Sequence, residues 1–118
     1  MTAPKPFTRA VVVDHGEEAG ITWATCKAPR WGAINGYARL PEGHPWRDTG
    51  GDSVPADVNG GITYNMHGGE WIGFDTLHSY DYWPEMPWVP DAWNTHWTAD
   101  MVANEARHLA RQIAEAAQ

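Results

Sequence analysis

The stretch DVNGGITYNMHGGEWIGFDTLHSYDYWPEMPWVPDAWNTHW (residues 57–97) is the part around which the rest of the chain is organised. It contains five of the eight tryptophans, three of the six histidines and two Gly-Gly pairs, which is more than a small core requires. We interpret it as a strand (57–64), a hairpin loop (65–69), a second strand (70–77) and a long Trp/Pro-rich loop (78–97). The second strand is the best candidate for the centre of a sheet.

Three further strands are predicted upstream of this stretch. TRAVVVD (8–14) has a β-branched run, ITWATCK (21–27) alternates with the period of a half-buried strand, and HGEEAG (15–20) between them predicts a turn. WGAINGYARL (31–40) predicts a third strand, although its Asn-Gly pair could instead form a hairpin turn or a bulge. Residues 41–56 contain three prolines and three glycines and are predicted to be loop.

A C-terminal helix is the clearest prediction. Thr98 is a good N-cap, and Asp100 places a carboxylate near the positive end of the helix dipole. One apolar stripe runs along residues 99–116, formed by Val102, Ala106, Leu109, Ile113 and Ala116. The sequence therefore predicts an α+β fold, with a mostly antiparallel sheet of about five strands and one amphipathic helix packed on one face.

Composition limits the class of protein. A chain of 118 residues predicts one domain (8–118), preceded by a flexible arm (1–7) with two prolines. A single cysteine excludes an intrachain disulfide, and no apolar run is long enough for a signal or a membrane span, so we expect a cytoplasmic protein. A net charge of −7 without a basic stripe argues against nucleic-acid binding. The acidity predicts either a solubilising surface or mimicry of nucleic acid.

Asp75 and His78 are the candidate catalytic residues. With His67 and Asp57 nearby in the predicted hairpin, they could form a mixed divalent-metal site or a His–Asp general base. The simpler interpretation is that they cap turns. Because the chain has no HExxH, CxxC, P-loop or GxSxG pattern, we expect no cofactor and no metal, with a divalent metal as the alternative.

Aromatic residues in the predicted loops suggest a different chemistry. They could stack on a flat ligand such as a nucleobase, with polar neighbours to orient it, or could form a protein-binding surface or cover the core edge. Arg39 and Arg47 are candidate phosphate partners, although Arg39 could equally be an exposed strand charge. The predicted ligand-binding residues are His44, Trp46, Asn59, Gly60, Gly61, Tyr64, His67, Asp75, His78, Trp83 and Trp88.

Three motifs also resemble a group of small uncharacterised proteins from actinobacteria and their phages. NGYARLPEGHPWR (35–47), DVNGGITY (57–64) and WIGFDTLHSYD (71–81) are similar to GYVxxPxGHP, VHGGLTY and WxGFDxxH in that order. The resemblance implies a shared fold and an actinobacterial or phage origin, without a mechanism. Asn59 stands where the group's pattern has histidine, so no role of that histidine carries over.

Three functions are therefore considered. The first is a binding protein for a small, nucleotide-like ligand, for example a phage protein that sequesters a signalling nucleotide and so inhibits a host system. The second is a protein-binding inhibitor of a host protein that uses the acidic and aromatic surface. The third is a small hydrolase that uses Asp75 and His78. A homodimer through exposed aromatic residues is compatible with each of them.

Overall fold

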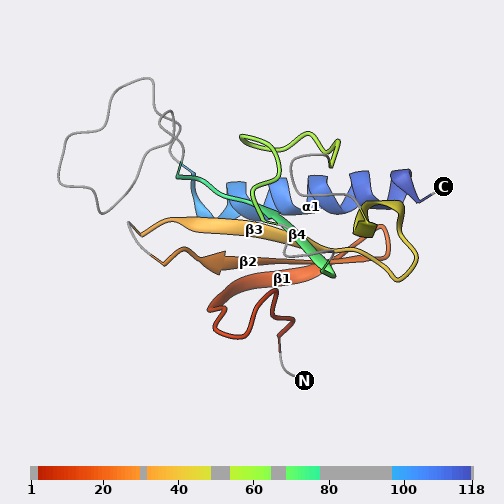
Figure 1. The fold of residues 1–118 in the computed structure, drawn as a ribbon. Coiled ribbons are helices and arrows are strands. Elements are labelled where there is room, and N and C mark those ends of the chain that lie inside the picture. The colour runs from red at the N-terminus through yellow and green to blue at the C-terminus, as the bar shows by residue number, and fades with distance from the viewer. Residues whose placement is uncertain (1–2, 30–31, 49–53, 65–68, 78–96, 118) are drawn as a thin grey trace.

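Residues 3–29, 32–48, 54–64, 69–77 and 97–117 are described by the computed structural model (Figure 1). Within these residues the fold is α+β, as predicted. An antiparallel sheet has the order β1-β2-β3-β4, and α1 lies across one of its faces (Figure 1). The elements are β1 (Val12–Glu18), β2 (Ile21–Lys27), β3 (Ile34–Arg39), the 3-10 helix η1 (Pro45–Asp48), β4 (Trp71–Phe74) and α1 (Ala99–Ala116).

The first hairpin lies further along the chain than predicted. β1 continues to Glu18, and its partner β2 begins at Ile21, so the turn is only Ala19 and Gly20. Both residues have positive φ, 54° and 81°, as the common two-residue hairpin turn requires. The polar run HGEEAG looks like a loop, but β1 is an edge strand, where charged side chains are tolerated and discourage further pairing.

The predicted strand over residues 57–64, the fourth in chain order, is wrong. Gly60 and Gly61 have φ of 69° and 80°, and the Gly61 N–H donates to the Val58 carbonyl, so the segment turns instead of extending. Its contact with the sheet is at its end, where the Thr63 and Tyr64 N–H groups donate to the Gly73 carbonyl and Tyr64 forms an isolated bridge with Gly73. β4 is consequently the last strand in the sheet order and not its centre. The described part of the sheet has four strands where about five were predicted.

Instead of joining the sheet, the segment 54–62 packs on the side that carries α1. Val58 and Ile62 are buried in the core with α1 residues. The Gln112 side chain accepts from the Asp57 N–H (2.7 Å) and donates to the Asp57 carbonyl (3.0 Å). Glu105, two helical turns earlier on α1, accepts from the Asn59 N–H at 3.0 Å. The helix therefore fixes this loop through polar contacts to its backbone.

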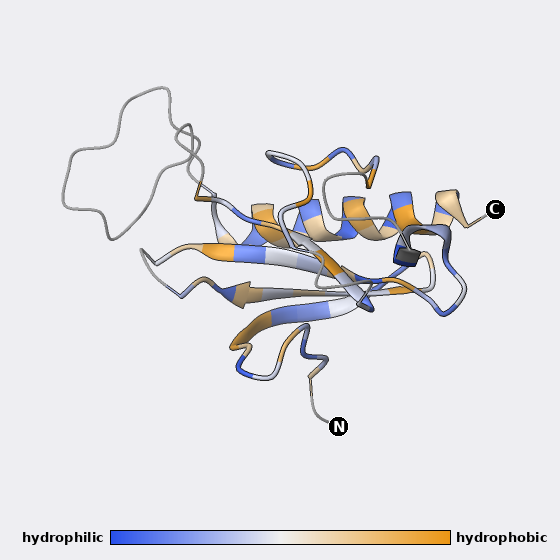
Figure 2. Cartoon of the chain, viewed as in Figure 1, coloured by the Kyte–Doolittle hydropathy of each residue, from blue (hydrophilic) through white to orange (hydrophobic). Residues whose placement is uncertain are grey.

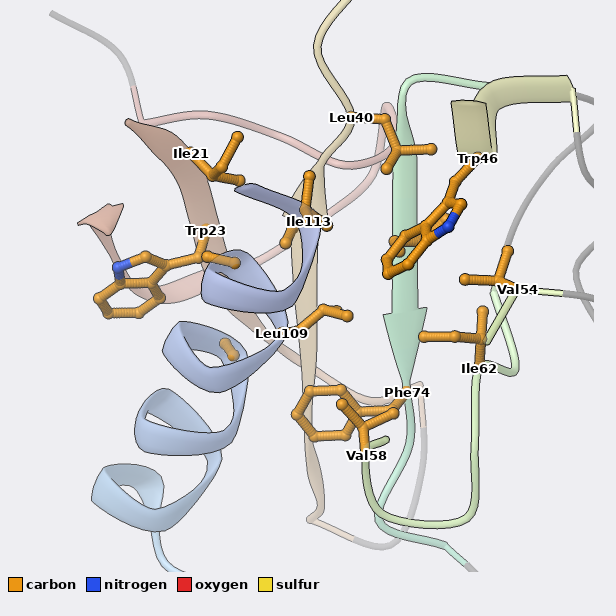
Figure 3. Close-up of a cluster of buried hydrophobic side chains, with 14 of the residues drawn as sticks. Ile21, Trp23, Leu40, Trp46, Val54, Val58, Ile62, Phe74, Leu109 and Ile113 are labelled. Carbon is orange, nitrogen blue, oxygen red and sulfur yellow. The ribbon is translucent and has the colours of Figure 1, made fainter. Parts of the chain in front are cut away.

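The main core lies between α1 and the sheet (Figure 3). The helix prediction is confirmed: the Thr98 hydroxyl accepts from the Met101 N–H at 3.2 Å as an N-cap. Apolar and polar residues alternate along α1 in Figure 2, and the buried ones include Val102, Leu109 and Ile113. Opposite them are Ile21, Trp23, Leu40, Ile72 and Phe74 from the sheet.

Two glycines allow aromatic rings to lie flat across the sheet. Gly36 stands opposite Phe74, and Tyr37 stands opposite Gly73. A Cβ on Gly36 would lie 2.5 Å from Phe74 Cε1, and one on Gly73 would lie 2.5 Å from Tyr37 Cδ1. Each ring thus occupies the space that a side chain on the facing glycine would need. The Asn35-Gly36 pair is therefore strand, neither the hairpin turn nor the bulge that its sequence allowed.

Candidate functional site

The face of the sheet away from α1 carries its own small cluster. Ala10, Cys26 and Tyr37 are buried there, and Phe7, Val12, Tyr64 and Trp71 pack against them. Residues 3–11 run along this side, below the sheet in Figure 1. Phe7, the last residue of the predicted flexible arm, is therefore part of the packed structure. A turn with an Ala10 N–H to Phe7 carbonyl bond of 3.1 Å leads from Phe7 toward β1.

Three rings meet on this face and form what we call the aromatic cluster, Phe7, Tyr37 and Tyr64. Tyr37 and Tyr64 have centroids 5.3 Å apart at 88°, and Phe7 lies 5.7 Å from Tyr37 and 5.9 Å from Tyr64. Edge-to-face geometry of this kind is favourable beyond the apolar area it buries. The Tyr64 hydroxyl also donates to the Pro6 carbonyl at 3.3 Å, which ties the N-terminal segment to the ring pair.

A cavity of about 590 Å³ opens beside these rings, and we call it the aromatic cavity. Its volume is in the range of small-molecule sites. Two cationic residues, Arg9 and Lys27, line it; both are exposed, and neither forms an ion pair with another described residue. The described residues that line it are Phe7, Arg9, Val11, Lys27, Ala28, Pro29, Tyr37 and Tyr64.

Burial keeps the titratable groups around the cavity protonated. It raises the pKa of the Tyr37 hydroxyl from 10.0 to about 12, with smaller contributions that include nearby Cys26. Burial also raises the pKa of Tyr64, and that of the Cys26 thiol from 9.0 to about 11. Both phenols are therefore neutral at physiological pH and can donate or accept hydrogen bonds. Cys26 is a buried neutral thiol, which does not act as a nucleophile.

These raised pKa values predict a loss of stability in alkali. The folded chain holds the Cys26 and Tyr37 protons more tightly than the unfolded chain does. The two groups therefore contribute fully to the free energy of unfolding below about pH 9. This contribution falls by about 1.4 kcal/mol per pH unit per group, for Cys26 between pH 9.0 and about 11 and for Tyr37 between pH 10.0 and about 12. Urea unfolding from pH 8 upwards measures this. The Cys26→Ala variant should show no such loss below pH 10; an equal loss in both proteins would contradict the assignment.

His44 and Trp46, two predicted ligand-binding residues, lie inside the protein. His44 is 4% exposed; its Nε2 donates to the Ile113 carbonyl (2.8 Å), and its Nδ1 accepts from the Trp46 N–H (3.0 Å). Trp46, predicted to be a loop residue, belongs to η1, and its ring lies among Leu40, Val54 and Ile62 in the core (Figure 3). The protein itself uses both ring nitrogens of His44, which joins η1 to the end of α1.

The NGG and GFD residues form a polar connection between loop and sheet. The Asn59 side chain donates to the Asp75 carbonyl at 3.2 Å, and Gly60 and Gly61 make the turn described above. Asp75 Oδ1 accepts from the Leu77 N–H at 3.0 Å, which caps the turn after β4. This contact is the one that the turn-capping interpretation expects of Asp75, while its pairing with His78 concerns a residue outside the described ones and stays a prediction. Among the predicted ligand-binding residues that the structure describes, Tyr64 is the one that lines the aromatic cavity.

Four of the predicted residues, His67, His78, Trp83 and Trp88, lie outside the described residues. Within the described part of the chain, no group of three or more His, Cys, Asp or Glu residues is arranged to hold a metal ion. The same part has no helix that is long and apolar enough to cross a membrane. The proposed convergence of Asp57, His67, Asp75 and His78 therefore stays a prediction.

Arg39 and Arg47, the candidate phosphate partners, line a separate polar groove of about 330 Å³. Arg39 Nε forms an ion pair of 2.8 Å with Glu70, and Arg47 donates two hydrogen bonds to the Leu40 carbonyl. Glu42 and Glu70 also line this groove, so an incoming phosphate would meet two carboxylates. The groove is a poor site for an anion.

The sequence interpretation missed most of the aromatic cavity. Phe7 and Arg9 lie in the stretch MTAPKPFTR, whose prolines suggested a loose arm, and Tyr37 lies in the predicted strand 31–40, which carries no binding signal. One signal was available. Four of the eight Lys and Arg residues fall within residues 5–30 of a strongly acidic chain, namely Lys5, Arg9, Lys27 and Arg30. Such clustering, next to aromatic residues, favours an anion-binding region.

Comparisons with protein-family models, with curated proteins and with solved structures found no match to this chain. The case for a function therefore depends on the geometry of the site.

Proposed function

We propose that the protein binds a small, flat, negatively charged ligand in the aromatic cavity. The observation that carries this proposal is the meeting of three aromatic rings and two cationic residues, neither of them in an ion pair with another described residue, around one cavity of about 590 Å³. Such cavities, mostly apolar with a few polar groups, are the usual form of small-molecule sites. Arg9 and Lys27 supply the positive charge.

The rings give the site its preference for flat molecules. Phe7 and Tyr64 are half-buried, so parts of their surfaces stay accessible, whereas Tyr37 is buried beneath them. Stacking of a planar ligand on an aromatic side chain contributes about 1–3 kcal/mol per ring. Gly73 supports this arrangement, because any side chain there would push Tyr37 toward the cavity.

The nucleotide-like ligand predicted from the sequence is one member of this class. Its sequestration by a phage protein in the cytoplasm, to inhibit a host system, stays a specific version of the proposal.

The two alternative functions, a hydrolase and a protein-binding inhibitor, have no feature of similar strength in the described residues. For the hydrolase, Asp75 is engaged in a turn and its partner His78 lies outside those residues. For the protein-binding inhibitor, the exposed apolar residues Val11 and Val13 could contact a partner. They lie, however, at a bulge in the edge strand β1, and such a bulge discourages pairing with another chain.

A thermal-shift screen tests the proposal. We would use aromatic acids and mono-, di- and cyclic nucleotides, with the wild type, Phe7→Ala and Met101→Ala; Met101 is an exposed apolar residue on α1, far from the cavity in sequence. A ligand at a hundredfold its Kd adds about 2.7 kcal/mol of stability, which raises Tm by on the order of ten degrees.

Phe7→Ala should weaken binding about tenfold or more, because it removes one stacking ring, while Met101→Ala should bind like the wild type. If Phe7→Ala bound every active ligand as tightly as the wild type, the ligand would not occupy this cavity. If no flat anion shifted the wild type, the proposed function would be wrong.

A further inference from the structure

We infer that the ligand of the aromatic cavity is a compact aromatic carboxylate and not a nucleoside polyphosphate. This inference rests on the proposed function and narrows it to one chemical class. Three features of the described residues support it. They are the composition of the cavity lining, the number and placement of the cations, and the engagement of both arginines in the polar groove lined by Arg39 and Arg47.

The lining offers little to a sugar or a phosphate chain. Six of its eight residues are apolar or aromatic: Phe7, Val11, Ala28, Pro29, Tyr37 and Tyr64. The other two, Arg9 and Lys27, are cations, so among the described residues no Asp, Glu, Asn, Gln, Ser or Thr side chain lines the cavity to bond ribose hydroxyls. A buried polar group without a partner costs binding free energy. A flat aromatic acid has only two polar atoms, its carboxylate oxygens, that need hydrogen-bond partners in the cavity.

The charges fit a monoanion better than a polyanion. Two cationic residues line the cavity of a chain whose net charge is −7. A triphosphate would bring several negative charges toward this acidic molecule, and among the described residues Arg9 and Lys27 alone line the cavity to oppose them. A carboxylate needs a single cationic partner, and the guanidinium of Arg9 matches its two oxygens in geometry. Lys27, an exposed point charge, would add attraction without a fixed geometry.

Neither the Tyr64 hydroxyl nor the polar groove provides an additional anion subsite. The Tyr64 hydroxyl donates its proton to the Pro6 carbonyl, so toward the cavity it offers acceptor lone pairs. Phosphate and carboxylate oxygens are both acceptors only, so neither anion gains a hydrogen bond from this group, and it does not favour one over the other. The polar groove on Arg39 and Arg47 does not supply a second anion subsite, because Glu70 and the Leu40 carbonyl already engage those side chains.

The test is isothermal titration of the wild-type protein with four probes: 2-naphthoate, the neutral 2-naphthalenemethanol, AMP and ATP. We expect naphthoate to bind most tightly, with the neutral alcohol about tenfold weaker because it lacks the charge-assisted hydrogen bond. AMP and ATP should bind at least tenfold more weakly than naphthoate.

Charge-removing variants locate the carboxylate. Arg9→Gln should weaken naphthoate binding about tenfold and leave binding of the neutral alcohol unchanged. Arg111→Gln is the matched control, since Arg111 lies on α1, at the opposite face of the sheet from the cavity, and forms an ion pair with Glu18 of β1. Equal naphthoate affinity in Arg9→Gln and the wild type would overturn the role of Arg9. Tighter binding of AMP or ATP than of naphthoate, lost in Phe7→Ala, would overturn the ligand class while the cavity stood as the binding site. Failure of all four probes to bind would count against the proposed function itself.

Discussion

Replacing His44 with alanine should lower the free energy of unfolding by about 3–5 kcal/mol, one of the largest effects of any single substitution in this protein. The imidazole bridges the Ile113 carbonyl and the Trp46 N–H, at 2.8 and 3.0 Å, and is almost completely buried. Alanine would leave one buried acceptor and one buried donor without their partner. It would also open a cavity between η1 and α1, next to the Trp46 ring.

Urea unfolding would measure this loss, with His108→Ala as the matched control. His108 is a half-buried histidine on α1, and alanine is a good helix residue, so its replacement should change stability by less than about 0.5 kcal/mol. His44→Gln, which can keep one of the two hydrogen bonds, should fall between the two. A His44→Ala protein as stable as His108→Ala would mean that the ring does not hold the fold, and a ligand role for His44 would return.

Gly36→Ala should destabilise the protein by about 1–3 kcal/mol, although it adds a single methyl group. The new Cβ would lie 2.5 Å from Phe74 Cε1, and Phe74 is among the most buried side chains of the core. The ring cannot move away, because Ile72, Leu109 and Val58 occupy the same packed cluster. We expect a fall in Tm on the order of ten degrees.

The origin of this effect can be separated from a change in backbone freedom. Gly20→Ala is the control, because Gly20 has nothing within 4 Å of its would-be Cβ and only its φ of +81° opposes alanine, at a cost of about 1 kcal/mol. Adding Phe74→Leu to Gly36→Ala should restore part of the stability in a double-mutant cycle. If the two substitutions were simply additive, the ring would not be the cause.

Elements with a strong local period were predicted correctly from the sequence. Residues 99–116 form α1 with the predicted bounds and cap, and residues 21–27 form β2. The apolar stripe of α1 matches the face that tertiary packing buries. β2 is instead buried on both faces, with Ile21 and Trp23 in the main core and Cys26 in the cluster on the other side, where its alternation predicted one buried face. β1 was displaced because its polar half, DHGEE, lies on an exposed edge, where alternation carries no signal.

The error over 57–64 has a different cause. DVNGGITY has the composition of a strand weakened by two glycines, but both glycines take positive φ and turn the chain toward α1. What fixes the segment there is a pair of long polar side chains, Glu105 and Gln112, bonded to its backbone. Contacts between residues about fifty positions apart leave no trace in local periodicity, so the helix looked simply amphipathic.

The candidate site was hard to predict for a related reason. The GHP, NGG and GFD motifs drew attention because they are unusual, and the structure gives His44, Gly61 and Asp75 local tasks in packing and turns. The aromatic cavity is assembled from the N-terminal segment, the end of β2, β3 and Tyr64. Tyr37 and Tyr64 lie within two of the quoted motifs, but Phe7, Arg9 and Lys27 do not. The fold brings these residues together.

The measurement that tests the account most directly is a titration of ¹⁵N-labelled protein with 2-naphthoate, followed by the shifts of the backbone amides. The account predicts that the largest changes fall on residues 7–11, 27–28, 37 and 64, around the aromatic cavity. Changes centred on residues 83–97, with the cavity amides unmoved, would show that the tryptophan-rich stretch binds the ligand and that the site proposed here is wrong.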